Sequence, residues 1–126
     1  SSMLRQRTLV EVLGNANSAE VTATLLFDRE GQLLAFHGYG DGGTANVNAA
    51  LISGIWEAFD RKAGSREGIT ELTLVNTDGV MGVTKIGAML LAMKATPLVS
   101  IGMMRTKLHA LAAYLEEPLA KVAKGT

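Results

Sequence analysis

The alternation of apolar and polar residues along the chain predicts three helices and five strands. Apolar residues recur at every second position in the predicted strands and at every third or fourth position in the predicted helices. Glycine, asparagine, aspartate and proline between these segments mark the turns. The predicted helices cover residues 4–13, 45–62 and 101–117, and the predicted strands cover 20–27, 32–37, 71–76, 82–86 and 88–94.

Polar residues are expected to start the two longer helices. Thr44 follows the glycine-rich stretch 38–43, and Ser100 follows Thr96-Pro97, so each can accept a hydrogen bond from the first free amides of a helix. Pro118 is expected to end the last helix, because proline lacks the amide hydrogen and clashes with the preceding turn.

The order of these elements, α-β-β-α-β-β-β-α, predicts an α/β protein of the α+β type. Short turns join most of the strands, so we expect a largely antiparallel sheet with the helices laid against it. A chain of 126 residues, 48% of them hydrophobic and 19% charged, can form one domain with its own core. We expect that domain over residues 3–124, with Ser1 and Ser2 as a cloning remnant before a natural start at Met3.

Composition and charge remove several classes of function. Twelve basic residues balance twelve acidic ones, so no overall field attracts nucleic acid or an anionic membrane. The absence of cysteine excludes disulfides, thiolate catalysis and cysteine-ligated zinc, and two histidines are too few for a histidine-rich metal site. No apolar run reaches the roughly 18 residues of a membrane span, and no leader opens the chain, so we expect a soluble intracellular protein.

The middle helix carries more apolar surface than one sheet can cover. Its apolar arc spans roughly 200° on a helical wheel, whereas a helix lying on a sheet needs about 100° or somewhat more. The arc consists of Ile52, Trp56, Phe59 and Ala63 on one side and Val47, Leu51, Ile55 and Ala58 on the adjoining side. Either the first or last helix covers the excess, or a partner protein does. We favour a partner, because a patch centred on Trp56 and Phe59 is typical of an interface.

The segment 71–76 opens the final three-stranded meander and is expected at an edge of the sheet. Its residues Leu72, Thr73, Leu74 and Val75 include no lysine, proline or other residue that guards an edge against pairing. Either the linker over 63–70 covers this edge, or the edge is open to a strand from another chain.

The glycine-rich stretch has the spacing of a nucleotide-binding loop. Gly38, Gly40 and Gly43 match G-x-G-x-x-G between a strand and a helix, where a dinucleotide loop would lie. The preceding strand belongs to a hairpin rather than to a βαβ unit, and no acidic residue ends a following strand at the usual distance. We interpret the stretch as a structural connection and keep a nucleotide-binding or enzymatic domain as the alternative.

Other polar residues do not form a pattern typical of catalysis. His37 and Asp41 have no nucleophile on a strained turn beside them in the sequence. Glu116 and Glu117 lie at a predicted helix end, where carboxylates are usually solvated. We therefore expect no enzyme activity, no catalytic residue, no cofactor and no metal.

Four segments, taken together in this order, resemble one family. They are Met3-Leu4-Arg5 with Val12-Leu13, Leu33-Leu34-Ala35 leading to Gly38-Tyr39-Gly40-Asp41, Ile55-Trp56 with Asp60-Arg61, and Tyr114-Leu115-Glu116-Glu117-Pro118-Leu119 followed by Val122-Ala123. Over residues 3–123 the chain resembles the roadblock/LC7-type adaptor subunits of the Ragulator complex, which act on late endosomes and lysosomes and pair with the MEK-binding-partner scaffold.

The resemblance implies the roadblock/LC7 fold, a five-stranded antiparallel sheet with one long helix on one face and two helices on the other. Members of the family dimerise through their long helices and through the edge formed by the third strand. On this chain the resemblance makes these residues the predicted protein interface: Ile52, Ile55, Trp56, Phe59, Leu72 and Leu74.

The implied function is non-catalytic. The resemblance predicts a heterodimer with a second roadblock-domain protein that holds other Ragulator subunits on the cytoplasmic face of late endosomes and lysosomes. There it would support MAP-kinase signalling, with the kinases bound through the partner, and TORC1 nutrient signalling through Rag-type small GTPases. Leu4 after Met3 offers no myristoylation site, so membrane attachment is expected to be indirect. The alternative within the fold is a homodimer that regulates a small GTPase or is attached to dynein.

Overall fold

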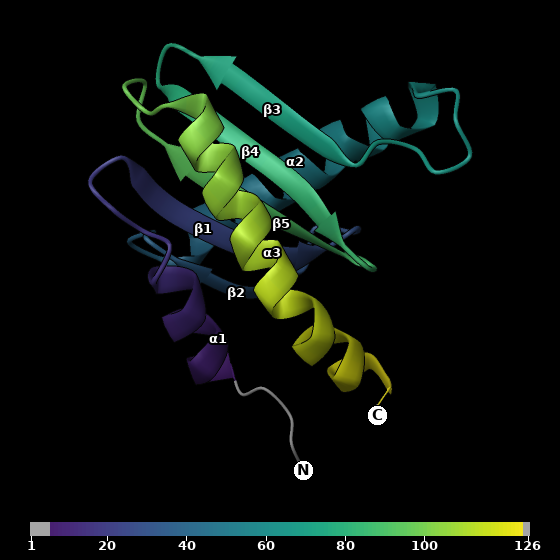
Figure 1. Ribbon diagram of the computed structural model, residues 1–126, viewed down its shortest axis with the longest axis horizontal. Coiled ribbons are helices and arrows are strands. Elements are labelled where there is room, and N and C mark those ends of the chain that lie inside the picture. Colours follow the sequence, from purple (N-terminus) through teal and green to yellow (C-terminus); the bar gives the residue numbers. More distant parts are fainter. Residues whose placement is uncertain (1–5, 125–126) are drawn as a thin grey trace.

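A computed structural model describes residues 6–124, with side chains from 7 to 120. The strands are β1 (Val21–Asp28), β2 (Leu33–His37), β3 (Glu71–Asn76), β4 (Gly79–Ile86) and β5 (Met89–Ala95), and the helices are α1 (Gln6–Gly14), α2 (Gly42–Lys62) and α3 (Ile101–Lys124) (Figure 1). All the predicted elements are present in the predicted order. Several expectations concern residues outside the described part: the cloning remnant expected at Ser1-Ser2, the start expected at Met3, the first positions of the helix predicted from Leu4, and the side chains of Val122 and Ala123.

The five strands form one antiparallel sheet in the order β2-β1-β5-β4-β3. The neighbours β1 and the central strand β5 are distant in sequence, and Leu25 of β1 lies opposite Ala92 of β5. The strands β2 and β3 form the two edges, so the prediction that segment 71–76 lies at an edge is confirmed.

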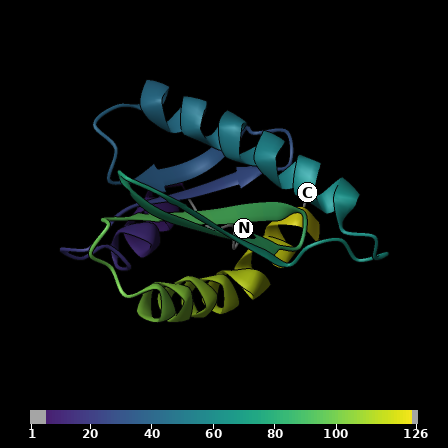
Figure 2. The same cartoon turned by 90° about the horizontal axis from the view of Figure 1, so that it is seen from above.

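Helices cover both faces of the sheet, with α2 on one face and α1 and α3 on the other (Figure 2). Successive residues of β1 point to opposite faces, so Leu25 and Phe27 join the core beneath α2 while Leu26 joins the core beneath α1 and α3. Met104 and Leu108 of α3 are fully buried in the second core. This arrangement is the one that the family resemblance implies.

The start of α2 differs from the prediction. Asp41 is the N-cap, with extended backbone angles, and its Oδ1 accepts a hydrogen bond of 2.8 Å from the Thr44 amide. The helix therefore begins at Gly42, and the prediction of Thr44 as its N-cap is wrong. Aspartate and threonine are both good N-cap residues. Because Asp41 comes three residues before Thr44, capping by its carboxylate starts the helix three residues earlier than predicted.

The last helix continues through Pro118 instead of ending there. Proline removes one hydrogen bond from the ladder, but Leu115 and Leu119, on either side of it, are both buried against the sheet. Packing of one continuous apolar stripe therefore holds the chain helical beyond the proline. At the other end Ser100 caps the helix as predicted, since its Oγ accepts a hydrogen bond of 3.3 Å from the Met103 amide.

Strand β4 starts three residues before the predicted position, because the turn that precedes it is tight. Asn76 lies opposite Gly79, and the Asn76 Oδ1 accepts hydrogen bonds from the amides of Asp78 and Gly79. Gly79 has a φ of 151°, and a Cβ at this position would lie 2.2 Å from the carbonyl oxygen of Ala95. Only glycine fits this close approach between the turn and β5.

Candidate protein-interaction surface

One flank of α2 is apolar and exposed. Val47, Leu51 and Phe59 are 58%, 61% and 50% exposed, and Ile55 and Ala58 are half-buried beside them. The helices α1 and α3 lie on the opposite face of the sheet and cannot reach this flank. The alternative in which the first or last helix covers the excess apolar surface is therefore wrong.

Two of the predicted interface residues belong to the core of the single chain. Trp56 and Ile52 face the sheet, with exposed fractions of 0% and 3%. Neither presents a surface to a partner, so the prediction of direct contact is wrong for both. Their role is to hold α2 on the sheet, which sets the direction of the exposed flank. Val47 and Leu51, which belong to the apolar arc of the wheel but not to the predicted interface, are exposed instead.

The exposed flank of α2 faces the β3 side of the sheet. On the opposite flank, the Cα of Ala50 and the Oγ of Ser53 would each lie 2.9 Å from a Cβ on Gly31, in the turn between β1 and β2. Asn48 lines a hollow of about 160 Å³ together with Met81 and the turn between β3 and β4. Because Asn48 and Ile55 are seven residues apart, they share one side of the helix, and that side is turned towards β3.

The edge strand β3 completes the surface. Leu72 and Leu74 lie opposite Val83 and Met81 of β4, on the face that carries α2, and both are half-buried. Among the described residues no backbone hydrogen bond joins the linker 63–70 to β3, so the linker does not pair with the free edge. We use the name α2–β3 surface for Val47, Leu51, Ile55, Phe59, Leu72, Leu74 and the free edge beside them.

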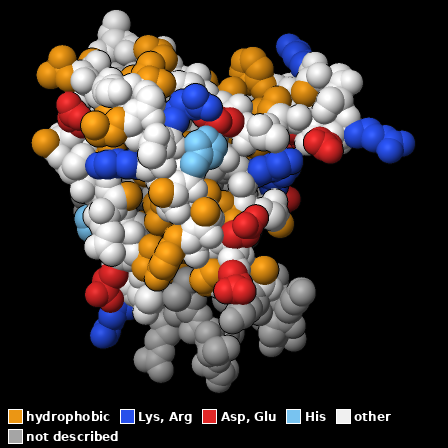
Figure 3. Space-filling view, viewed as in Figure 1, with side chains coloured by type: hydrophobic (Ala, Val, Ile, Leu, Met, Phe, Trp, Pro, Cys, Tyr) orange, Lys and Arg blue, Asp and Glu red, His pale blue; other side chains and the backbone are white. Residues whose placement is uncertain are grey.

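On the other face of the sheet, Glu71 ties β3 to α3. Its Oε1 accepts hydrogen bonds of 3.0 Å from the Nη2 of Arg105 and 3.0 Å from the Nε2 of His109, and its Oε2 accepts one from the Nε of Arg105. The hydrogen bonds from Arg105 lower the pKa of the Glu71 carboxyl, partial burial opposes this, and His109 adds to the lowering. Figure 3 views this face, where acidic, basic and histidine side chains meet over α3 and β4.

The glycine-rich loop before α2 forms a tight turn and a helix cap. Gly38 has a φ of 97°, and a Cβ there would lie 2.1 Å from the carbonyl oxygen of Thr22, so only glycine fits. The carboxylate of Asp41 already accepts the hydrogen bond of the Thr44 amide, one of the donors that a bound phosphate would need. The loop is therefore built as a turn and a helix cap.

The other polar residues that the sequence singles out lie apart from one another. The Nδ1 of His37 lies 2.9 Å from the Nδ2 of Asn17, so this histidine fastens the loop that follows α1. Glu116 and Glu117 are exposed. In the described part of the chain, no group of three or more histidine, aspartate or glutamate side chains is placed to hold a metal ion.

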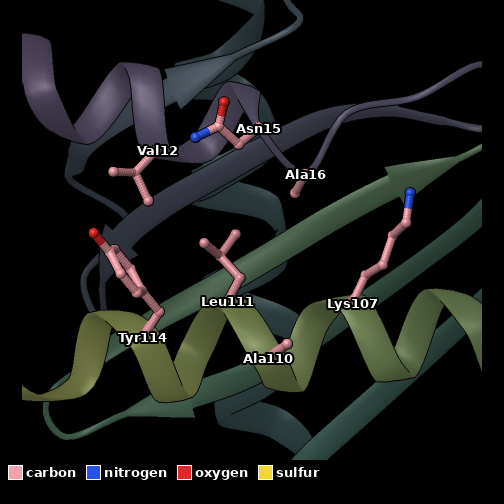
Figure 4. A pocket seen from close by; sticks show the side chains of 7 residues that line it. All are labelled: Val12, Asn15, Ala16, Lys107, Ala110, Leu111 and Tyr114. Atoms are coloured by element: carbon pink, nitrogen blue, oxygen red, sulfur yellow. The ribbon is translucent and has the colours of Figure 1, made fainter.

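A shallow groove of about 410 Å³ lies between α1 and α3 (Figure 4). Val12, Leu111 and Tyr114 line its apolar part, and Lys107 lies towards one end. No carboxylate or histidine is among its lining residues, and Lys107 and Tyr114 are the titratable groups that line it. Within residues 6–124, no helix has the length and hydrophobicity that a membrane span requires.

Comparison with known proteins gives one close relative in sequence and several in structure. No protein-family model matches the sequence. The Ragulator complex protein LAMTOR2 homolog of Caenorhabditis elegans is 44% identical over 123 residues, which cover 96% of this chain and 97% of that protein.

Two solved structures have the same fold at low sequence identity. A roadblock/LC7 domain from Streptomyces avermitilis is 20% identical, covers 94% of this chain and 99% of its own, and has a TM-score of 0.79. MglB from Myxococcus xanthus is 16% identical, covers 96% of each chain and has a TM-score of 0.80. These likenesses confirm the roadblock/LC7 fold that the sequence predicts.

Proposed function

The chain belongs to the family of the Ragulator complex protein LAMTOR2, and from this premise we propose that it is a non-catalytic adaptor subunit of such a complex. The observation that carries the proposal is the α2–β3 surface. It combines an exposed apolar helix flank with a free sheet edge on the same side of the molecule. Monomeric proteins rarely leave both open, since each promotes association.

We propose that the α2–β3 surface binds a second roadblock-domain protein. A strand of the partner would pair with β3 and extend the sheet, while the partner's long helix would pack along α2. Ile55, Phe59, Leu72 and Leu74 remain predicted contacts, and Val47 and Leu51 join them because of their exposure. Backbone hydrogen bonds to an edge strand and burial of adjacent apolar side chains are complementary sources of affinity.

We propose further that the heterodimer holds other Ragulator subunits on the cytoplasmic face of late endosomes and lysosomes. Membrane contact would be indirect, through those subunits. In this place the complex would serve MAP-kinase signalling, with kinases bound through the partner, and TORC1 nutrient signalling through Rag-type small GTPases. What supports these assignments is the family relationship to a Ragulator protein over nearly the whole chain.

The direct test is reconstitution with the second roadblock subunit of the Ragulator complex from the same organism. The two proteins are purified separately and mixed, and their mass in solution is measured by light scattering after gel filtration. We expect a one-to-one complex for the wild type. Leu51→Glu and Phe59→Glu should weaken it by about 30-fold or more, corresponding to roughly 2 kcal/mol, because each places a charge in an apolar contact.

Tyr114→Glu is the matched control, since Tyr114 is also an exposed aromatic residue (64%) but lies on α3, on the other face. If Leu51→Glu and Phe59→Glu both bind the second subunit with wild-type affinity, the α2–β3 surface is not the binding site. If the wild-type chain does not bind the second subunit but forms a homodimer through the same residues, the result supports the homodimeric alternative.

A further inference from the structure

The edge strand β3 has little burial of its own. None of its six residues is fully buried, whereas most residues of its neighbour β4 are. Among the described residues it also pairs with a strand on one side only. Segments with so few buried contacts open locally at low free-energy cost, so side-chain ties add to the ladder with β4 in fixing the position of β3.

One of these ties is the cluster of Glu71, Arg105 and His109. Arg105 and His109 are four residues apart on α3, so both side chains leave the same face of the helix and reach one carboxylate. Arg105 binds Glu71 through two donors in the fork geometry of a bidentate pair. The Glu71 side chain is 18% exposed, while those of Arg105 and His109 are 50% and 48% exposed. The carboxylate is thus the enclosed centre of the cluster.

Two further hydrogen bonds fix the chain just before β3. The Oγ1 of Thr84 donates to the carbonyl oxygen of Thr70 at 3.1 Å, and the Ile69 amide donates to the Oδ1 of Asp60 at 2.8 Å. The ties therefore gather at the N-terminal end of the strand. Because the Glu71 cluster lies on the α3 face, it leaves the free edge and the α2–β3 surface unobstructed.

We propose that Glu71, Arg105 and His109 form a clasp that pre-orders β3 for pairing with a partner strand. The clasp residues are positioning residues, which act on binding through the strand rather than by touching the partner. A strand already fixed in its bound geometry loses less conformational freedom on association, so affinity rises without a new contact. This inference rests on the proposed pairing of β3 with a second roadblock protein.

The test is a double-mutant cycle on the full chain with Glu71→Gln, Arg105→Gln and the pair combined. Hydrogen exchange of the amides of residues 71–76 is measured on the free chain, and the Kd for the second roadblock subunit is measured by titration. We expect faster exchange in β3 and a Kd raised about two- to fivefold in each single variant, with the double variant no worse than either. Arg66→Gln, which removes an exposed arginine from the linker, should change neither quantity.

The outcomes separate the clasp from the interface itself. Additive losses in the double variant, or weaker binding with unchanged exchange in β3, would mean that the side chains touch the partner directly and would overturn the clasp. If every variant binds the second roadblock subunit as tightly as the wild type does, the clasp is overturned but the proposed interface is not. Failure of the wild type to bind would overturn the proposed function and the clasp with it. If Glu71→Gln does not fold, Arg105→Gln and His109→Gln replace it, and each should both speed exchange in β3 and raise the Kd; a raised Kd without faster exchange would overturn the clasp.

Discussion

Trp56 and Leu51 lie five residues apart on one helix and have opposite environments. Trp56 is fully buried, while Leu51 is 61% exposed. A helical wheel gives the width of the apolar arc but not the part of it that faces the sheet. The orientation of α2 is set by contacts far away in sequence, such as the close approach of Gly31 to Ala50 and Ser53. For this reason the excess of apolar surface could be predicted from the sequence, but the residues that provide it only in part: Phe59 is exposed as expected, whereas Trp56 is not.

Replacing Trp56 should therefore destabilise the single chain. We expect Trp56→Ala to lower the free energy of unfolding by about 3–5 kcal/mol, because it removes a large buried side chain and leaves a cavity. Val47→Ala, at an exposed position of the same helix, should change it by less than about 0.5 kcal/mol. Urea denaturation of the isolated chain measures both. If Trp56→Ala is nearly as stable as the wild type but no longer binds the partner, Trp56 contacts the partner directly, as the sequence predicts.

Glu71 should give the fold a pH-dependent contribution. Its pKa is lowered below the ordinary value of 4.5, chiefly by the hydrogen bonds from Arg105. A lowered carboxyl pKa in the folded state means that the stabilisation is present at neutral pH and is lost as the pH falls through that lowered pKa. The difference in unfolding free energy between wild type and Glu71→Gln should thus shrink as the pH is lowered from about 6 to below the ordinary pKa of 4.5. A difference that stays constant over this range would contradict the assignment.

At the scale of elements, positions were predictable and several boundaries were not. Alternation and turn residues locate all the helices and strands, since each pattern depends on a local period. The two misplaced helix ends depend on competition between local rules. Asp41 and Thr44 are both acceptable caps, and Pro118 disfavours a helix that the burial of Leu115 and Leu119 favours. In the second case tertiary packing outweighs the local preference.

The cap of α2 can be tested directly. We expect Asp41→Ala to lower the free energy of unfolding by about 1 kcal/mol, because the Thr44 amide loses its acceptor. Thr44→Ala should have a smaller effect, since its side chain caps nothing. Thermal or urea unfolding of the two variants gives the comparison. A larger loss for Thr44→Ala than for Asp41→Ala would restore the helix start that the sequence predicts.

At the scale of the whole molecule, only part of the topology follows from local features of the sequence. Short turns require antiparallel neighbours within the hairpin and within the final meander. The family resemblance supplied the layer arrangement, with one helix on one face and two on the other. The joining of β1 to β5 leaves no local mark in the sequence, because no turn connects those two strands.

That central pairing has a consequence for how the chain folds as it is made. The hairpin of β1 and β2 can form once residue 37 has been synthesised, but the second neighbour of β1 is complete only at Ala95. Bringing β1 and β5 together closes a long loop, and this costs conformational entropy before the contacts between the two strands form. We therefore expect the meeting of β1 and β5 to limit the folding rate. Until then the apolar side chains of β1 and α2 on the nascent chain have no completed sheet on which to pack.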